Sequence, residues 1–280
     1  MPKPQRGHIT RRDNISGGNG PMTKDLKLAL LVSDSMKAQA GSEAIRAAYD
    51  WVPTEEADVL VVLGGDGYLL HVLHQMLDSN RLKPCYGLNL GTVGFLMNRM
   101  SGSRGIADRI GRAREVDVAP LQMDAVTQDG EHHRFYAINE VSLLRETRQS
   151  AKLEVAINGK VRMQELSGDG ILVSTPAGST AYNLSANGPI LPLGSKLLAL
   201  TPISPFRPRR WKGAILPESA KVSFRVREAA KRPVAAVADQ KEVRDVAEVN
   251  ISVARNHRLT LLFDPGKTLE ERIFAEQFQV

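Results

Sequence analysis

The sequence predicts an N-terminal α/β domain with a parallel sheet. A C-terminal β-rich, sandwich-like domain is expected to follow, then a C-terminal helix that packs back on the N-terminal domain. From Leu26 to about Arg114, short and nearly continuous apolar runs alternate with helical patterns, as in parallel sheets that helices cover on both faces. After about Val116, apolar and polar residues alternate with a period of two, which is typical of antiparallel strands with one buried face.

The predicted division of the chain has four parts. Residues 1–22 are basic, rich in Gly and poor in large apolar residues, so we expect a disordered extension there. The α/β domain is expected over residues 23–118 and the β-rich domain over residues 119–264. Residues 265–280 are expected to return to the N-terminal domain through a short helix, Leu269–Phe278.

The elements of the N-terminal domain follow from its apolar spacing. Buried strands are expected at Leu26–Val32, Val59–Leu63 and Cys85–Leu88, where apolar residues run almost without interruption. Helices are expected over Met36–Tyr49, directly after the second strand, and around Ile106–Ile110. These alternating strands and helices predict a parallel sheet.

The strands of the β-rich domain are expected where apolar and polar residues alternate. They include Leu153–Ile157, Val222–Val226, Val249–Val253 and Leu259–Phe263. Asn158-Gly159 directly follows the first of these runs and is a hairpin turn signal. The pattern therefore predicts antiparallel hairpins over most of this half.

Composition limits the classes of function. The chain has 37 Lys and Arg against 31 Asp and Glu, a net charge of +6, and only 5% aromatic residues, so nucleic acid is not expected as a partner. Its apolar runs are far shorter than the ~20 residues of a membrane span, so no membrane is expected. Cys85 is the only cysteine, which excludes an intrachain disulfide and a CxxC site. No secretory apolar segment is seen near the N-terminus, so a cytoplasmic protein is expected.

The sharpest local motif is Gly64-Gly65-Asp66-Gly67, between a predicted strand and a predicted helix. Glycines allow close approach of a ligand to the backbone, and a helix N-terminus favours phosphate. The loop is neither a Walker A loop nor a GxGxxG loop. A carboxylate in a phosphate cradle is useful only if it accepts a proton, holds a metal or binds a hydroxyl. Asp66 is thus a candidate base for phosphoryl transfer to an alcohol; the alternative is that it only caps the helix.

Two further motifs lie in the β-rich half. Asn139-Glu140 separates two apolar runs, and an amide beside a carboxylate can clamp two hydroxyls of a ribose; the alternative is a simple turn. The stretch Gly168–Pro189 is dense in small polar residues. We expect a strand, a loop with room for a flat ligand, and a short helix from about Ser179, with Ser179 and Thr180 as N-caps. The alternative is a capped helix after a hairpin.

In this order and at these intervals, the three motifs resemble those of the NAD kinase family, of the bacterial type that uses ATP or polyphosphate. The resemblance spans about residues 60–189, and its third motif is far more specific than the first. It implies a phosphotransferase with an alcohol acceptor, which phosphorylates the 2′-hydroxyl of the adenosine ribose of NAD and so makes NADP. It also implies the two-domain fold predicted above.

The resemblance implies roles for individual positions. Asp66 would be the general base, Asn139 and Glu140 would contact the adenosine, also from a neighbouring subunit, and Phe95 would lie near the adenine. The implied nucleotide-binding residues are Gly65, Asp66, Gly67, His71, Asn89, Phe95, Asn139, Glu140, Asp169, Ala177, Thr180, Ala181, Tyr182, Asn183, Leu184, Ser185 and Gln240. Gly64, Gly91 and Gly94 belong to the same loops.

The sequence departs from the family pattern at two places. Ser167 stands where many members carry a basic residue, two positions before the acid of the third motif, and Asp239-Gln240 replaces a later Asp-Gly pair. Outside these motifs, the basic stretch Pro205–Lys212 either neutralises a triphosphate or is a solvated loop. His74 is expected to be a surface residue.

The resemblance also implies cofactors and partners. NAD and ATP or polyphosphate would be substrates, a divalent cation such as Mg²⁺ would arrive with ATP, and the chain would form a homodimer or homotetramer. No protein-built metal site is expected, because no HExxH or similar spacing occurs. Two alternatives stay open: a lipid kinase that shares the Gly-Gly-Asp-Gly loop, and a dinucleotide sensor without transfer activity.

Overall fold

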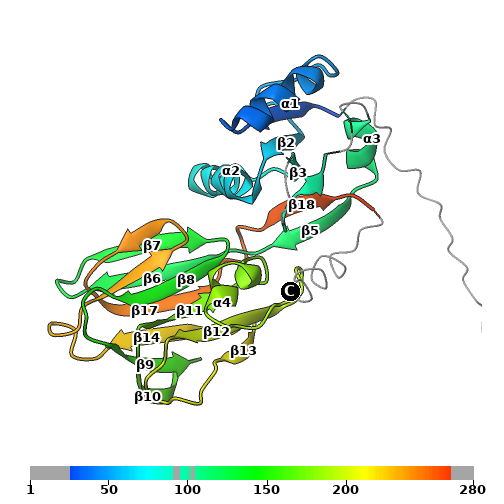
Figure 1. The fold of residues 1–280 in the computed structure, drawn as a ribbon. Coiled ribbons are helices and arrows are strands. Elements are labelled where there is room, and N and C mark those ends of the chain that lie inside the picture. The colour runs from blue at the N-terminus through cyan, green and yellow to red at the C-terminus, as the bar shows by residue number, and fades with distance from the viewer. Residues whose placement is uncertain (1–25, 91–94, 101, 103–104, 266–280) are drawn as a thin grey trace, which may run out of the picture.

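The computed structural model describes residues 26–90, 95–100, 102 and 105–265, which form three six-stranded sheets in two halves (Figure 1). The expected extension 1–22, the helix Leu269–Phe278, Gly91 and Gly94 lie outside the described residues. In the described part of the chain, no helix combines the length and the apolar character that crossing a membrane requires.

The first sheet is the parallel sheet that the N-terminal pattern predicts. Its strand order is β1-β2-β3-β18-β5, with β4 on β3. The strands are β1 Leu28–Val32, β2 Val59–Gly64, β3 Cys85–Asn89, β4 Asn98–Arg99, β5 Arg114–Val118 and β18 Leu259–Phe263. Neighbours β1, β2 and β3 pair in parallel. Every residue of β2 is buried, as expected for a strand in a parallel sheet that is covered on both faces.

The helices divide between the two faces of this sheet. α1 Met36–Arg46 and α3 Ile106–Gly111 bury Ile45 and Ile106 in one apolar cluster. α2 Asp66–Ser79 buries Leu69 and Leu73 in a second cluster on the other face. That second cluster also contains Ile138 and Ala177 of the β-rich half, so α2 lies where the two halves pack together.

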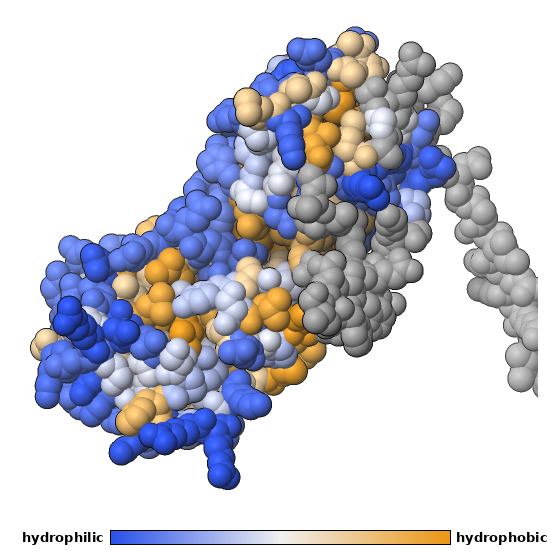
Figure 2. All heavy atoms as spheres, in the orientation of Figure 1, coloured by the Kyte–Doolittle hydropathy of each residue, from blue (hydrophilic) through white to orange (hydrophobic). Residues whose placement is uncertain are grey.

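The β-rich half is a sandwich of two antiparallel sheets, as predicted. One sheet has the order β10-β9-β14-β17-β6-β7 and the other β13-β12-β11-β8-β15-β16. Strand β6 alternates buried and half-buried residues along its whole length, and one apolar cluster takes residues from both sheets. Figure 2 shows hydrophilic residues along much of the outer rim and apolar residues gathered toward the middle of each half.

The bounds of the remaining elements complete the sandwich. They are β6 Leu121–Thr127, β7 His132–Ala137, β8 Glu140–Arg145, β9 Ala151–Ile157, β10 Lys160–Gly168, β11 Gly170–Ser174, a 3₁₀ turn Gly178–Thr180, α4 Tyr182–Ser185, β12 Leu197–Ile203, β13 Ala214–Pro217, β14 Val222–Val226, β15 Val234–Ala238, β16 Lys241–Val243 and β17 Val246–Val253.

Two predicted boundaries are wrong. The range 119–264 of the β-rich domain includes β18, yet β18 pairs in parallel with β3 and antiparallel with β5 in the first sheet. Its two faces are buried in the two clusters of that sheet, and a period of two does not say which sheet a strand joins. The helix expected over Met36–Tyr49 ends at Arg46. Tyr49 lies beyond it, packed edge-on against Trp51.

Candidate active site at the junction of the two halves

The glycine loop connects β2 to α2 at the carboxyl edge of the first sheet. A Cβ on Gly64 would lie 3.1 Å from Ser33 and from the Tyr68 ring, whereas a Cβ on Gly65 or Gly67 would meet nothing within 4 Å. The close packing of Ser33 and Tyr68 therefore leaves little room for a side chain at position 64. Gly65 and Gly67 are exposed and leave the backbone open to a ligand.

The alternative in which Asp66 only caps the helix is wrong. The N-cap is Gly65, and Asp66 is the first residue of α2. The carboxylate of Asp66 instead accepts hydrogen bonds from the backbone N–H of Phe95, at 2.7 Å, and of Leu96, at 3.3 Å. These bonds hold a half-buried carboxylate in a fixed orientation beside the open loop.

The loop after β3 lies beside the glycine loop. Asn89 ends β3 and is the register partner of Gly64, and Phe95 is half-buried against the cluster that α2 covers. In sheets of this kind, ligands bind outside the carboxyl ends of parallel strands. The structure thus brings Gly65, Asp66, Gly67, Asn89 and Phe95 to one edge of the first sheet.

The Asn139-Glu140 turn packs against the third motif. The carbonyl of Asn139 accepts the N–H of Thr175 at 2.9 Å, and the Thr175 hydroxyl donates to the carbonyl of Ile138 at 2.6 Å. A Cβ on Gly178 would lie 2.2 Å from the Asn139 carbonyl oxygen, so only glycine fits there. The turn and the loop around Gly178 form one tightly packed unit.

The helix expected from about Ser179 is shorter and capped differently. The structure has a 3₁₀ turn and then α4, whose N-cap is Ala181 with no side-chain bond. Ser179 is wrong as an N-cap, because its buried hydroxyl donates to the Pro176 carbonyl and accepts the N–H of Leu191. Thr180, the other predicted cap, is not the N-cap of α4 either.

Asn183 faces the protein interior. Its side-chain amide donates to the carbonyls of Ser179 and Pro189, and its oxygen accepts the hydroxyl of Thr201. The residue is fully buried. These bonds give Asn183 a structural role under the loop. Ala177 is also buried, whereas Thr180, Ala181, Tyr182, Leu184 and Ser185 stay at least partly accessible.

Three polar side chains of the β-rich half share one electrostatic environment. Burial raises the pKa of Tyr182, and the negative charges of Asp169 and Glu140 raise it further. Asp169 lies between β10 and β11 and pairs with Arg145 at 2.6 Å. Arg145 thus supplies a cation near the third motif, where Ser167 is buried and bonded to Ser150. No local sequence signal marks Arg145 as a site residue.

Glu140 is the site residue whose carboxyl group is least well satisfied among the described side chains. One of its carboxylate oxygens is buried without a hydrogen-bond partner among the described residues. Burial, and then the charge of Asp239, raises the pKa of this carboxyl to about 8. A buried polar oxygen without a partner is costly, and a ligand hydroxyl would satisfy it.

Asp239 joins the Asn139-Glu140 turn to α2. Its carboxylate accepts backbone N–H groups of that turn and lies 2.7 Å from the His74 ring. The prediction that His74 is a surface residue is therefore wrong. Gln240, which the resemblance singled out, is exposed beside Asp239, and His71 is exposed on α2 with its ring against Tyr68. Asp239 has a left-handed backbone conformation, which could not be predicted from the sequence.

The basic stretch 205–212 is mostly exposed. Arg207 and Arg209 lie over the ring of Phe206. This arrangement resembles a solvated loop more than a closed anion site.

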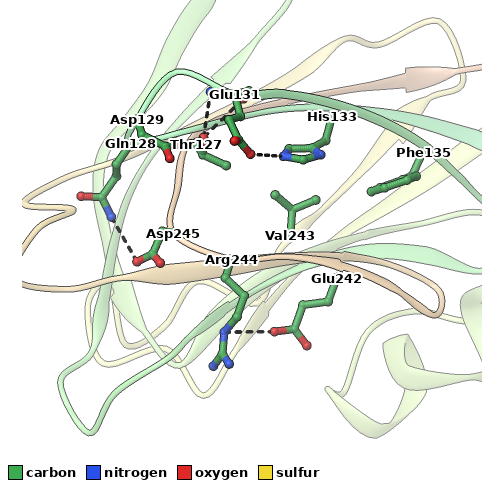
Figure 3. Close-up of a pocket in the computed structure, with 10 residues that line it drawn as sticks. All are labelled: Thr127, Gln128, Asp129, Glu131, His133, Phe135, Glu242, Val243, Arg244 and Asp245. Carbon is green, nitrogen blue, oxygen red and sulfur yellow. Dashed lines mark hydrogen bonds and ion pairs between the residues drawn. The ribbon is translucent and has the colours of Figure 1, made fainter.

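A hollow of about 610 Å³ lies elsewhere in the sandwich, between the β6–β7 turn and β16. None of the predicted site residues lines it. Figure 3 shows its polar side chains directed at one another: Glu131 at His133, Glu242 at Arg244 and Gln128 at Asp245. Because these groups are already paired, this hollow is not part of the candidate site.

Comparison with known proteins agrees with the motifs. The ATP-NAD kinase C-terminal domain family matches residues 138–264. The NAD kinase of Rhizorhabdus wittichii is 58% identical over 254 residues, which are 91% of this chain and 98% of the relative. The NAD kinase of Caulobacter vibrioides is 56% identical, over 90% of this chain and 96% of the relative.

Solved structures show the same fold. Yeast NADH kinase complexed with NADH matches with a TM-score of 0.67 and 25% identity, over 79% of this chain and 65% of that one. An NAD kinase from Archaeoglobus fulgidus in complex with ATP matches with a TM-score of 0.69 and 23% identity, over 90% of this chain and 98% of that one. On the strength of its close relatives, the chain belongs to the NAD kinase family.

Proposed function

We propose that this NAD kinase family member transfers the terminal phosphoryl group of ATP to the 2′-hydroxyl of the adenosine ribose of NAD, and that Asp66 is the general base. One observation carries the assignment of the base. The Asp66 carboxylate is oriented by two backbone N–H groups at the open glycine loop, and it does not serve as a helix cap.

The chemistry asked of Asp66 is proton acceptance. A carboxylate has about four acceptor positions, and in this proposal one of those on Asp66 takes the substrate hydroxyl. As the 2′-oxygen attacks the γ-phosphorus, its proton passes to Asp66, and the bond from phosphorus to the bridging oxygen of ADP breaks. Because Asp66 lies on a rigid helix, its oxygens are held in place before the substrate arrives.

The dinucleotide is assigned to the β-rich side of the junction. Asn139 and Glu140 would bind adenosine hydroxyls, and the unpartnered oxygen of Glu140 fits such a hydroxyl. Asp169, Tyr182 and the accessible residues near them would contact the rest of NAD, with Phe95 near the adenine. Asn183 supports this surface from below through its buried bonds.

The phosphate donor is assigned to the amino end of α2. Exposed backbone at Gly65 and Gly67 and the positive end of the helix suit phosphate. ATP is present in the archaeal NAD kinase structure of the same fold, and polyphosphate is the alternative donor. The described ranges hold no group of three or more His, Cys, Asp or Glu side chains placed to bind a metal.

A divalent cation brought by ATP would neutralise charge on the phosphates. Mg²⁺ takes one or two protein carboxylates together with substrate phosphates. Asp66 faces the substrate hydroxyl in this proposal, so the phosphates of ATP and water would hold the cation. We also propose the α/β and β-rich halves as the two domains of the enzyme, and a homodimer or homotetramer as its assembly, which light scattering would measure.

The reaction is tested by supplying NAD, ATP and Mg²⁺ and following NADP with an NADP-specific dehydrogenase. NADP should form with NAD, and a dinucleotide that lacks the 2′-hydroxyl of the adenosine ribose should give no phosphorylated product. Parallel reactions with polyphosphate identify the donor. Absence of NADP with every donor, despite NAD binding, would favour the sensor alternative and refute the proposal.

A further inference from the structure

The carboxylate of Asp239 accepts several hydrogen bonds near the candidate site. One of its oxygens accepts the N–H of Ile138 at 2.6 Å, and the other accepts the N–H groups of Asn139 and Glu140, each at 3.1 Å. Three successive backbone donors thus converge on a side chain that comes from a different hairpin, between β15 and β16. The Asn139-Glu140 turn depends on this carboxylate for its shape.

The same carboxylate also contacts the helix of the catalytic aspartate. The Nε2 atom of His74 lies 2.7 Å from Asp239, and both side chains are largely buried, with 13% and 8% of their surface exposed. His74 lies eight residues after Asp66 on α2, which is ~12 Å along the helix axis. A rigid helix therefore connects Asp66 to His74, and one hydrogen bond connects His74 to Asp239.

We propose that Asp239 and His74 form a positioning pair that fixes the Asn139-Glu140 turn relative to Asp66. The inference rests on the proposed function, in which that turn holds the adenosine ribose. The pair touches no substrate. It acts by holding the ribose hydroxyl at the distance from Asp66 that proton transfer requires.

The charge of Asp239 also reaches the turn. It contributes to the raised pKa of Glu140, so the two carboxyl groups lie close enough to interact. The protein keeps Asp239 beside Glu140 in spite of this repulsion, which fits a carboxylate retained for its hydrogen bonds.

An ion pair between the same two elements provides a matched control. Lys241 lies 2.7 Å from Asp78, near the end of α2, and both side chains are exposed. This pair joins α2 to the β15–β16 hairpin, and among the described residues its side chains make no hydrogen bond to the Asn139-Glu140 turn. If the role of His74 were only to join the two halves, Asp78→Asn would have a similar effect.

The test compares His74→Leu with His74→Gln and Asp78→Asn in the full chain. We expect His74→Leu to lower kcat/KM for NAD about 10- to 100-fold, because small displacements of reacting groups cost rate steeply. Most of this loss should appear as a lower kcat and a higher KM for NAD, with the KM for ATP unchanged. His74→Gln keeps a donor near Asp239 and should recover most of the activity, and Asp78→Asn should stay within about twofold of the wild type.

Thermal unfolding of each variant separates positioning from folding. If His74→Leu does not fold, His74→Gln and Asp239→Asn carry the test: Asp239→Asn removes one acceptor from the turn and should raise the KM for NAD without changing that for ATP. The inference fails if folded His74→Leu or Asp239→Asn matches the wild type, or if Asp78→Asn is equally impaired. A wild type that makes no NADP would instead refute the proposed function.

Discussion

The two sides of the candidate site are built in opposite ways. The glycine loop of the first sheet is open, and a Cβ at Gly65 would touch nothing. The turn and loop of the β-rich half are tightly packed, and a Cβ at Gly178 would overlap the backbone of Asn139. The first side presents backbone to a ligand, whereas the second holds side chains through buried hydrogen bonds. Substitutions on the two sides should therefore fail in different ways.

The largest difference is expected from one matched pair of glycine substitutions. Gly178→Ala forces its new methyl group onto the Asn139 carbonyl, and overpacking of this kind costs about 3 kcal/mol or more. Gly65→Ala should lower the free energy of unfolding by only about 1 kcal/mol, the usual difference between glycine and alanine at an N-cap. Urea unfolding of both variants checks the comparison, and equal destabilisation would contradict it.

A somewhat smaller effect is expected at Asn183. Asn183→Ala removes three buried hydrogen bonds and leaves the Thr201 hydroxyl without its acceptor. We expect a loss of about 3 kcal/mol of unfolding free energy. NAD affinity measured well below the unfolding temperature should fall less than stability does. A variant with normal stability but no NAD binding would show that Asn183 contacts the nucleotide after all.

The raised pKa of Glu140 predicts a pH dependence of stability. Because its folded pKa of about 8 exceeds the unfolded value near 4.5, the folded state binds the proton more tightly. This contribution to stability is complete below about pH 4.5 and is lost as the pH rises toward 8. Glu140→Gln should therefore lose less stability than the wild type between pH 5 and 8.5, by about 4 kcal/mol. Urea unfolding at the two pH values measures this difference. An equal loss of unfolding free energy in the wild type and in Glu140→Gln would contradict the assignment.

Much of the open side could be predicted from the sequence, because its signals are local. The strand, the four-residue loop and the helix are consecutive, and Asp66 is noticeable because it is the only acid among glycines. The packed side depends on contacts between distant segments. Asn139 and Gly178 are 39 positions apart, and His74 and Asp239 are 165 apart.

Local spacing misled where tertiary contacts decide. His74 looked like a surface residue because it lies off the apolar face of its helix, yet that side of α2 meets the β15–β16 hairpin. β18 looked like another strand of the sandwich, because alternation specifies a strand but not its neighbours. Ser179 looked like a cap, but a buried hydroxyl bonded to Leu191 explains it better.

The central claim is that Asp66 accepts the proton of the ribose hydroxyl. Its most direct test is Asp66→Asn, with kcat measured by NADP formation and the dissociation constant for NAD measured by calorimetry. The substitution keeps the size of the side chain and an acceptor for the N–H of Phe95 or Leu96. We expect kcat to fall at least about 100-fold, with NAD affinity within a few-fold of the wild type. Normal turnover by this variant would contradict the claim.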